Sequence, residues 1–259
     1  MTVIAGESKY RAPALEKGLD ILELLSREES GLTTAEIARR LDRTVGEVFR
    51  MIVVLEARGY IAQGASDRFG LTSRLFEIAH RTPLIGRLTA VAQPVMRALT
   101  AAIHQSAHLT VLTGGSVLVI EQVNGPGNSH MVVQLGAAIE LWRASSGRVI
   151  LAFMEPHQRR RVIERFPPPD GADVAAVEAE IEAIRTAGYE VRESFVVRGV
   201  TNIAAPIIDH SGLPVAALTV PYIDLLNDPL PFDACCQAVV AAASTLTASL
   251  GGTVRLPLG

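Results

Sequence analysis

The sequence predicts a two-domain α/β (α+β) protein, in which an amino-terminal winged helix-turn-helix precedes a larger mixed domain with a mainly antiparallel sheet. Two helix-start signals, at Thr33 and Thr44, lie eleven residues apart, with room for one short turn between the helices. Two short strand-like segments separated by a turn follow the second of these helices. Beyond residue 84, alternating apolar segments and amphipathic helical segments follow one another, which favours a sheet covered by helices.

Length and composition indicate a globular chain with a substantial core. The chain has 259 residues, of which 49% are hydrophobic, and this length exceeds one typical domain. No apolar run approaches the ~20 residues of a membrane-spanning helix, and the first thirty residues do not resemble a signal peptide. We therefore expect a cytoplasmic protein with no membrane partner. Cys235 and Cys236 are adjacent in an apolar stretch and are expected in the core, with redox sensing as the alternative.

The charge of the amino-terminal segment is balanced rather than basic. The net charge is −3; residues 1–82 hold twelve basic and twelve acidic side chains, and residues 83–259 hold twelve and fifteen. Affinity for DNA comes largely from Lys and Arg side chains that displace counterions from the phosphates. With a balanced charge we therefore expect each protomer to bind DNA with modest affinity, and we expect a dimer on a two-fold site to raise that affinity. Six arginines nevertheless gather on and around the helix-turn-helix: Arg39, Arg40, Arg43, Arg50, Arg58 and Arg68.

Three helices are predicted before the wing. Leucines at positions 15, 19, 22 and 25 recur at helical intervals and predict a first helix over 14–25. Thr33 with Glu36, and Thr44 with Glu47, each form a capping box, which fixes where the next two helices begin. The last of the three is predicted to bury one apolar stripe consisting of Val45, Val48, Ile52 and Leu55.

The opposite face of that helix carries the strongest signal for DNA binding. Phe49 beside Arg50 on an outward face suits contact with a thymine methyl group and with a guanine or phosphate in the major groove. In the alternative, both side chains only brace the backbone. The DNA-binding candidates are Thr34, Arg43, Thr44, Gly46, Glu47, Phe49, Arg50 and Arg68.

A wing and a linker follow the helix-turn-helix. Segments 61–63 and 68–71 are predicted to form a hairpin across a 64–67 turn, after a helix end at Gly59. Arg68, near the tip, is placed for the flanking minor groove or backbone, with a solvated turn arginine as the alternative. The expected boundaries are 12–72 for the winged helix-turn-helix, 73–84 for a linker helix within a helical pattern over 72–81, and 85–252 for the larger domain.

In the larger domain, helical and strand patterns alternate. The predicted elements, in order, are a helix over 84–105 that passes Pro94, a hairpin of 108–113 and 116–123, a strand over 130–135, a helix from the 144–147 turn to Met154, a helix over 173–186 that ends at Gly188, a hairpin of 195–208 and 213–223, and a closing helix over 233–250.

Over roughly residues 12–252, the chain resembles the IclR family of bacterial transcriptional regulators. The resemblance depends on the order and spacing of the segments ALEKGLDIL (14–22), AEIARR (35–40), LEARGY (55–60), RTAGYEV (185–191) and GVTNIAAPI (199–207). It implies a winged helix-turn-helix, a linker helix and a GAF-like effector-binding domain, assembled as dimers or tetramers on operator DNA. The family's recognition helix usually opens with Lys-Ser-Thr-Val-His-Arg, whereas positions 45–50 read Val-Gly-Glu-Val-Phe-Arg, so only Val48 and Arg50 match.

The effector site is expected at the helix start formed by Ser145, Ser146 and Gly147, where free N–H groups and the helix dipole favour a carboxylate. The resemblance implies that this turn, the residues after the Gly-Val segment and the last long strand line the pocket. Trp142 and Asn202, which stand where the family often has His and Cys, suit an aromatic or hydroxylated acid, although Trp142 may equally fill the core. The effector-binding candidates are Met131, Trp142, Ser145, Ser146, Val200, Asn202 and Thr219. Three arginines could supply the positive charge opposite the effector's carboxylate, or could instead be solvated surface residues: Arg143, Arg192 and Arg198.

The sequence favours a regulator over an enzyme. It has no G-x-S-x-G elbow, P-loop or dinucleotide fingerprint, and its histidines lack metal-ligand spacing, so we expect no catalysis, cofactor or metal. The expected function is transcription regulation, with double-stranded operator DNA, a small organic-acid effector and a homodimer or homotetramer as partners. The alternative is a metabolite-sensing or protein-interaction module without operator binding.

Overall fold

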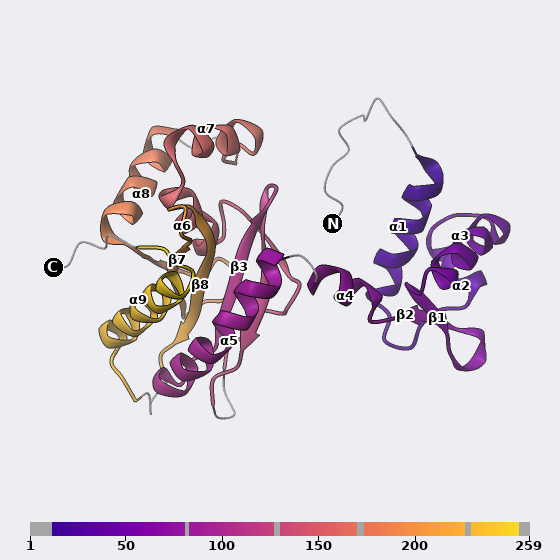
Figure 1. Ribbon diagram of the computed structural model, residues 1–259, viewed down its shortest axis with the longest axis horizontal. Helices are drawn as coiled ribbons and strands as arrows, with labels where there is room; N and C mark the ends of the chain where they lie inside the picture. Colours follow the sequence, from indigo (N-terminus) through magenta and orange to yellow (C-terminus); the bar gives the residue numbers. More distant parts are fainter. Residues whose placement is uncertain (1–11, 81–82, 127–129, 170–173, 226–228, 254–259) are drawn as a thin grey trace. The chain divides into compact units, whose positions relative to one another are not determined.

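The computed structural model describes residues 12–80, 83–126, 130–169, 174–225 and 229–253 (Figure 1). The chain divides into two compact units, Met1–Gly86 and Arg87–Gly259, which have separate hydrophobic cores. None of the helices in the described ranges combines the length and the hydropathy needed to cross a bilayer.

The first unit is a three-helix motif with a two-stranded wing. Its elements are α1 (Pro13–Leu25), α2 (Thr34–Arg40), α3 (Val45–Ala57), β1 (Ile61–Gln63), a short 3-10 turn η1 (Ala65–Asp67), β2 (Phe69–Leu71) and α4 (Arg74–His80). β1 and β2 pair antiparallel, which confirms the predicted wing. The core contains Ile21, Leu25, Leu32, Ile37, Ala38, Val48, Ile52, Ile61 and Phe69.

The turn before α2 holds the wing against the helices. Leu32 pairs with Phe69 of β2 through two backbone hydrogen bonds of 2.8 and 3.0 Å. Gly31 makes this approach possible, because its φ is +67° and a Cβ atom there would lie 2.7 Å from the Phe69 carbonyl oxygen. The wing is therefore fastened at its base to the segment that leads into the helix-turn-helix.

The second unit is a six-stranded antiparallel sheet with helices on both faces. The strand order is β5-β4-β3-β8-β7-β6 and every neighbouring pair is antiparallel, as the sequence predicted. The elements are α5 (Pro83–Ile103), β3 (Ala107–Thr113), β4 (Ser116–Val123), β5 (Ala138–Glu140), α6 (Ser145–Phe153), α7 (Pro156–Arg165), α8 (Val174–Ala187), β6 (Glu190–Glu193), β7 (Val200–Ile208), β8 (Pro214–Ile223) and α9 (Phe232–Ser249).

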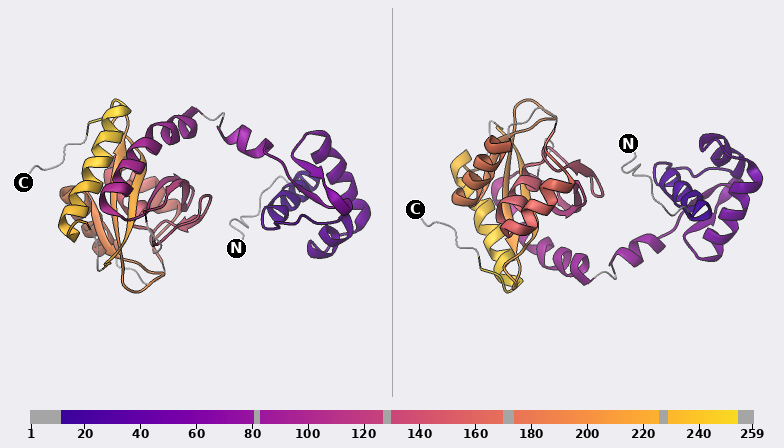
Figure 2. Two further views of the ribbon diagram at one scale, coloured as in Figure 1. Left: turned by 90° about the horizontal axis from the view of Figure 1, so that it is seen from below. Right: turned by 90° about the horizontal axis from the view of Figure 1, so that it is seen from above.

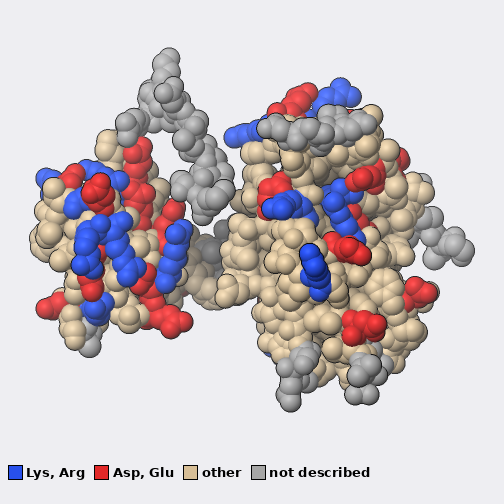
Figure 3. All heavy atoms as spheres, turned by 180° about the vertical axis from the view of Figure 1, so that it is seen from behind, with Lys and Arg blue, Asp and Glu red and all other residues tan. Residues whose placement is uncertain are grey.

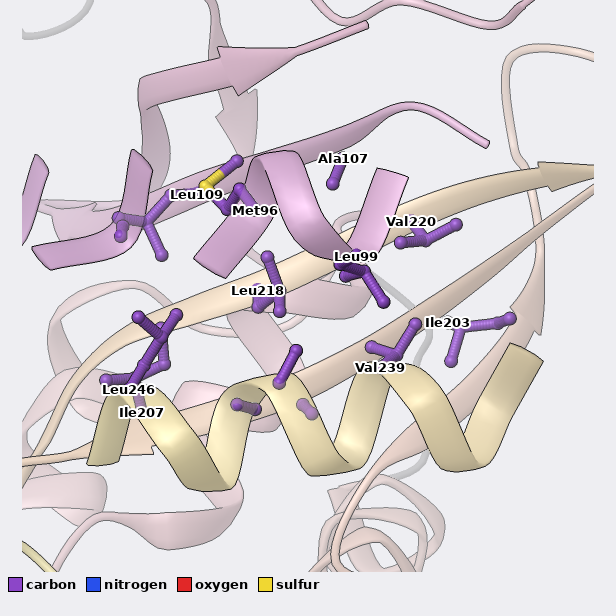
Figure 4. Close-up of a cluster of buried hydrophobic side chains, with 14 of the residues drawn as sticks. Met96, Leu99, Ala107, Leu109, Ile203, Ile207, Leu218, Val220, Val239 and Leu246 are labelled. Atoms are coloured by element: carbon purple, nitrogen blue, oxygen red, sulfur yellow. The ribbon is translucent and has the colours of Figure 1, made fainter. Parts of the chain in front are cut away.

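Two cores fill the two faces of this sheet. Figure 2 shows the helices that cover the sheet. On one face, α5 and α9 pack side by side; in Figure 4, Met96 and Leu99 of α5 and Val239 of α9 point toward strand residues such as Leu218. On the other face, α6 packs on β7 and β8 and is backed by α8. The fold thereby buries both faces of β7 and β8, which explains their nearly continuous apolar sequences.

Several predicted elements differ from the observed ones. Residues 130–135 form no strand; β5 comes later, at Ala138–Glu140, after a turn in which the Gly136 N–H bonds to the Val119 carbonyl. β7 begins at Val200 rather than at Phe195, because Gly199 has a φ of +78° and ends a loop there. The helix predicted over 72–81 is α4, and residue 81 lies outside the described residues, as does residue 173 before α8.

Two observed elements were not predicted at all, and one side chain was misplaced. The unpredicted elements are α7 and β6. Val45 of the predicted buried stripe is 54% exposed because it occupies the first position of α3, whereas Val48 and Ile52 are buried as expected.

The two cysteines belong to α9 and lie in the core, as expected. Cys235 and Cys236 are both buried, and neither forms a disulfide with another described residue. Burial raises the pKa of the Cys236 thiol to about 11, which leaves little of the thiolate that redox chemistry requires. These observations favour a packing role for the pair over redox sensing.

Candidate functional site

The first turn of α3 is fixed by a network that ties it to α1. The Thr44 hydroxyl accepts from the Glu47 N–H, and the Glu47 carboxylate accepts from the Thr44 N–H, which confirms the predicted capping box. Lys17 of α1 donates to Glu47 Oε1 at 2.6 Å. The hydrogen bond from Lys17 and those from Thr44 lower the pKa of Glu47 to about 2, so this carboxylate is ionised in neutral solution.

The outward face of α3 carries the aromatic ring of Phe49, the positive charge of Arg50 and, at Gly46, a backbone with no side chain. Phe49 is 56% exposed, and Arg50 and Gly46 are exposed as well. In the described part of the chain, Arg50 has no carboxylate partner. An α-helix fits the major groove, where a guanidinium can bind guanine or phosphate and an aromatic ring can contact a thymine methyl group.

The six arginines around the helix-turn-helix fall into two groups. Arg40, Arg43 and Arg68 are paired with acids of the same unit: Arg43 with Asp20 at 2.7 Å, Arg68 with Glu36 at 3.0 Å, and Arg40 with Glu28. The remaining three have no such partner among the described residues: Arg39, Arg50 and Arg58. Figure 3 shows the same mixture of blue and red on one face of this unit.

Arg68 is not at the free tip of the wing. Its guanidinium lies at the wing base, where it donates to the Gly31 carbonyl at 2.8 Å and to both oxygens of Glu36. Glu36 also closes the capping box of α2 with Thr33. Arg68 thus joins β2 to the start of α2, and neither the predicted tip position nor the solvated alternative describes it.

Two threonines complete the predicted DNA-binding set. Thr34 begins α2 and is half-buried, whereas Thr44 is exposed at the start of α3. Thr34 is the first residue of α2, and Thr44 is the N-cap of α3, where its N–H and its hydroxyl are both hydrogen-bonded to Glu47.

The second unit contains a cavity of about 280 Å³ over the α6 face of the sheet. Its floor comes from β3, β7 and β8, one wall from the start of α6, and its cover from the 131–137 and 194–196 segments. Six of the seven predicted effector residues line it: Met131, Ser145, Ser146, Val200, Asn202 and Thr219.

Trp142 is the exception among the predicted effector residues. Its side chain is 7% exposed and packs in the core beside α6 rather than along the cavity. The indole N–H donates to the Phe166 carbonyl at 2.9 Å, the partner that a buried indole requires. The alternative weighed from the sequence, a core position, is the correct one.

The start of α6, which lines the cavity, has backbone donors without a partner among the described residues. Ser145 and Ser146, the first two residues of the helix, are buried, and α6 has no side-chain cap. Neither of their N–H groups has an acceptor among the described residues. Gly147 is required behind them, because a Cβ atom there would lie 2.4 Å from the Leu141 carbonyl oxygen. Such a helix start is a ready site for an anion.

A buried ionic cluster holds α6 from behind. Arg148, with 8% side-chain exposure, donates to Glu190 of β6 at 2.7 Å and contacts Glu180 of α8 at 2.7 Å. Burial raises the pKa of Glu190, against the opposing effect of the Arg148 guanidinium. The cationic charge of Arg148 is thereby neutralised by its own partners and does not line the cavity.

The amino-terminal and carboxy-terminal parts of the chain match two domains of one family. Residues 14–65 match the IclR helix-turn-helix domain, and residues 85–247 match the carboxy-terminal domain of the bacterial transcriptional regulator IclR. This chain belongs to the IclR family. It is therefore related to transcriptional regulators that carry a DNA-binding domain and an IclR carboxy-terminal domain.

Relatives in this family align over most of the chain. The regulator BhcR of Paracoccus denitrificans is 31% identical over 241 residues, which cover 90% of this chain and 86% of BhcR. The Thermotoga maritima IclR structure has a TM-score of 0.72 at 22% identity and covers 92% of this chain and 98% of its own. An IclR homologue from Microbacterium hydrocarbonoxydans, complexed with 4-hydroxybenzoate, has a TM-score of 0.74 at 23% identity and the same two coverages.

Sequence reasoning missed three polar residues of the cavity: Gln134, Ser194 and His108. His108 lies on β3, its residue exposure is 4%, and it is in register with Thr219 of β8. Residue 108 was predicted to begin a strand, and the histidines were considered as possible metal ligands. The alternation of side chains between the two faces of β3 could have revealed His108, because this alternation directs it and Thr110 to the face of the sheet opposite to Leu109.

Proposed function

We propose that this IclR-family regulator binds a specific operator through the outward face of α3, and that a small carboxylic acid in the second unit modulates this binding. The observation that carries the DNA half is the exposed Phe49 and Arg50 on a helix whose first turn is locked to α1. In this proposal residues 12–72 bind DNA, 73–84 link the domains and 85–252 bind the effector. The setting is the cytoplasm, where the operator is accessible.

The residues of the first unit divide into contacts and supports. We assign base contacts to Arg50 and Phe49 in the major groove, and close approach of a phosphate to Gly46, which has no side chain in the way. Phosphate contacts are assigned to Thr34, Thr44 and Arg43. Glu47 acts as the helix cap, and Arg68 holds the base of the wing through Glu36 and the Gly31 carbonyl.

The cavity half of the proposal depends on unsatisfied donors. Two free N–H groups at the start of α6, with the helix dipole behind them, suit one carboxylate. The relative bound to 4-hydroxybenzoate supports an acid of this size. None of the three arginines considered as countercharges lines the cavity; Arg143 instead stacks over Phe195, with its Cζ atom 5.0 Å from the ring centroid.

Exposed apolar side chains of the first unit support a homodimer or homotetramer. Leu15 and Leu19 of α1 are 63% and 48% exposed, and Phe76 of α4 is 61% exposed. Contiguous exposed apolar patches mark association sites, and Leu15 and Leu19, four residues apart, lie on the same face of α1. A second copy is the partner that a two-fold operator requires.

Operator binding is tested by an electrophoretic mobility-shift assay at several salt concentrations. The DNA used is the operator that the wild-type chain selects from random-sequence DNA. We expect Arg50→Ala to weaken operator binding by roughly ten- to a hundredfold, the cost of one lost bidentate base contact. The matched control is Arg160→Ala, which removes an exposed arginine of α7 in the second unit and should leave binding unchanged.

Two results would contradict the DNA half. Equal losses in the two variants would mean that only overall charge matters. Failure of the wild-type chain to select any sequence would favour the alternative, a sensing or interaction module without operator binding.

A further inference from the structure

Three large apolar side chains of α3 lie on its outward face without contributing to the core of the first unit. Val45, Phe49 and Val53 follow one another at four-residue intervals, which places them on one face of the helix. They are 54%, 56% and 47% exposed. None of the three is among the described residues that form this core or pack against it. We call these three residues the exposed row of α3.

The surroundings of the exposed row leave room for a partner and favour a negatively charged one. Gly46 lies beside the row, and a Cβ atom there would meet open space. All of residues 45–53 are described, and Arg50 is the one charged side chain among those that are exposed. An exposed face that combines apolar side chains with an unpaired guanidinium suits a DNA groove better than an apolar protein surface.

The composition of this face limits how it can distinguish base pairs. In the major groove, Arg or Lys binds guanine, Asn or Gln binds adenine, and Asp or Glu binds cytosine, each through hydrogen bonds. Among the exposed residues from 45 to 53, Arg50 alone has a side chain of this kind. Apolar side chains instead contact the C5-methyl group of thymine, the apolar feature of the major groove. The exposed row can therefore distinguish bases by their methyl groups.

The length of the exposed row fits several neighbouring bases. Eight residues separate Val45 from Val53, which is about 12 Å along a helix that rises 1.5 Å per residue. This length corresponds to roughly three to four bases at about 3.4 Å per base along one strand. The row also begins at the first residue of α3, and it is the amino-terminal part of a recognition helix that contacts base edges.

We propose that the exposed row of α3 recognises C5-methyl groups in the major groove, so that each operator half-site combines a guanine bound by Arg50 with adjoining pyrimidines that carry this methyl group. Thymine carries it, and 5-methylcytosine presents it at the same ring position. This inference rests on the proposed function, because it takes the docking of α3 in the major groove as given. It adds Val45 and Val53 to the contacts and names the class of base that they select.

Uracil substitution tests the methyl groups without altering any hydrogen-bonding group of the base. Thymines of the operator half-site selected by the wild-type chain are replaced by uracil one at a time, and fluorescence anisotropy gives the dissociation constant of the full-length chain. We expect each contacted thymine to lose about fourfold in affinity when its methyl group is removed. Uracil placed only in the flanking DNA is the control and should leave the affinity unchanged.

A second arm of the experiment separates the methyl group from the rest of the thymine. At a position where uracil weakens binding, the T·A pair is replaced by a C·G pair, with or without a methyl group at C5 of the cytosine. We expect 5-methylcytosine to bind about fourfold more tightly than cytosine, because the apolar row gains the same contact. A thymine effect without a 5-methylcytosine effect would overturn the assignment to the methyl group.

Variants of the exposed row assign the effect to its residues. Val45→Ala, Phe49→Ala and Val53→Ala remove exposed atoms, so the core of the first unit stays intact. Each variant should bring the ratio of thymine to uracil affinity toward one at the position that its side chain contacts. Val191→Ala, which truncates a 42% exposed valine of β6 in the second unit, is the matched control and should retain the wild-type ratios. Wild-type ratios in all three variants of the row would overturn the proposal.

A second copy of the chain is the other partner that an exposed apolar row could bind. Sedimentation velocity without DNA compares the association state of the wild-type chain with that of Phe49→Ala. The proposal expects the same association state in both, together with a changed ratio of thymine to uracil affinity. A lower association state with an unchanged ratio would assign the row to protein contact and overturn the proposal.

The outcomes separate this inference from the proposed function. If the wild-type chain selects an operator whose half-sites lack thymine, or one in which uracil has no effect, the inference fails and the proposed function stands. If the wild-type chain selects no sequence, the inference and the DNA half of the proposed function both fail. The mobility shift with Arg50→Ala tests the proposed function alone, because guanine binding does not depend on a methyl group.

Discussion

Lys17 and Glu47 form an ion pair at the start of α3, the helix that we propose faces DNA. The chain has only two lysines, and this one reaches from α1 to the carboxylate that closes the capping box with Thr44. Glu47 is thereby engaged on three sides and does not stand as an isolated negative charge on the face offered to DNA. An acidic residue in a recognition helix is tolerated here because it is structural.

The stability of the first unit should fall in acid through Glu47. Its folded-state pKa of about 2 lies below the ordinary value of 4.5, so its stabilising effect is complete above about pH 4.5 and is lost as the pH falls through about 2. We expect Glu47→Gln to be less stable than wild type near neutral pH and to approach it at pH 2. Urea unfolding followed by the NMR signals of α3 amides measures this.

Glu56→Gln is the matched control, because Glu56 is an exposed acid of the same helix with no ion pair among the described residues. Its unfolding free energy should follow that of wild type across the same pH range. If Glu47→Gln and Glu56→Gln give the same pH profile, the network at the start of α3 does not contribute as described.

Single residues were the least predictable part of the effector site. The register of β7 and β8 and the α6 turn were readable from sequence, and they bring Ser145, Val200, Asn202 and Thr219 to one cavity. Trp142 was misplaced because its partner, the Phe166 carbonyl, follows a helix that the sequence pattern did not reveal. Such a partner cannot be identified from local spacing.

At the scale of elements, α6 is positioned by Arg148. This side chain ties α6 to β6 through Glu190 and to α8 through Glu180, and it lies one turn after the N–H groups that face the cavity. Removing one member of a buried ion pair leaves the other charge uncompensated. This loses more folding stability than replacing both members by uncharged residues. The cluster therefore keeps the helix start in place behind the ligand site.

Arg148→Met should destabilise the second unit by about 3 kcal/mol or more, and Arg148→Met combined with Glu190→Gln should recover a large part of that loss. Denaturant unfolding followed by the fluorescence of Trp142, the single tryptophan of the chain, reports on this unit. The control is Arg160→Met on the exposed side of α7, for which we expect a change below about 0.5 kcal/mol. A double variant as unstable as Arg148→Met would contradict this role.

The helices and strands that were predicted have a strong periodic pattern of apolar residues, and those that were missed lack such a pattern. The capped helices and the long strands combine apolar periodicity with clear start and stop residues. α7 buries none of its residues and carries four arginines, so its helical face gives no apolar stripe. β6 is a four-residue edge strand with three exposed residues, and edge strands of this length leave little alternation to detect.

At the scale of the whole molecule, the chain consists of two independently packed units. The DNA-facing helix belongs to the core around Ile37 and Ile52, and the cavity belongs to the sheet of the second unit. An effector can alter DNA binding only if it has different affinities for states that bind DNA differently. The 73–84 segment, which contains α4, is where we expect the two units to be coupled.

Thermodynamic linkage gives the most direct test of the central claim, that acid binding in one unit regulates operator binding by the other. The dissociation constant of 4-hydroxybenzoate, the acid in the complex of the Microbacterium hydrocarbonoxydans homologue, is measured by titration into the full-length chain, alone and with saturating operator. The account predicts a shift of roughly five- to a hundredfold, matched by an equal shift of operator affinity when the acid is saturating. An acid affinity that is the same with and without operator would contradict the account.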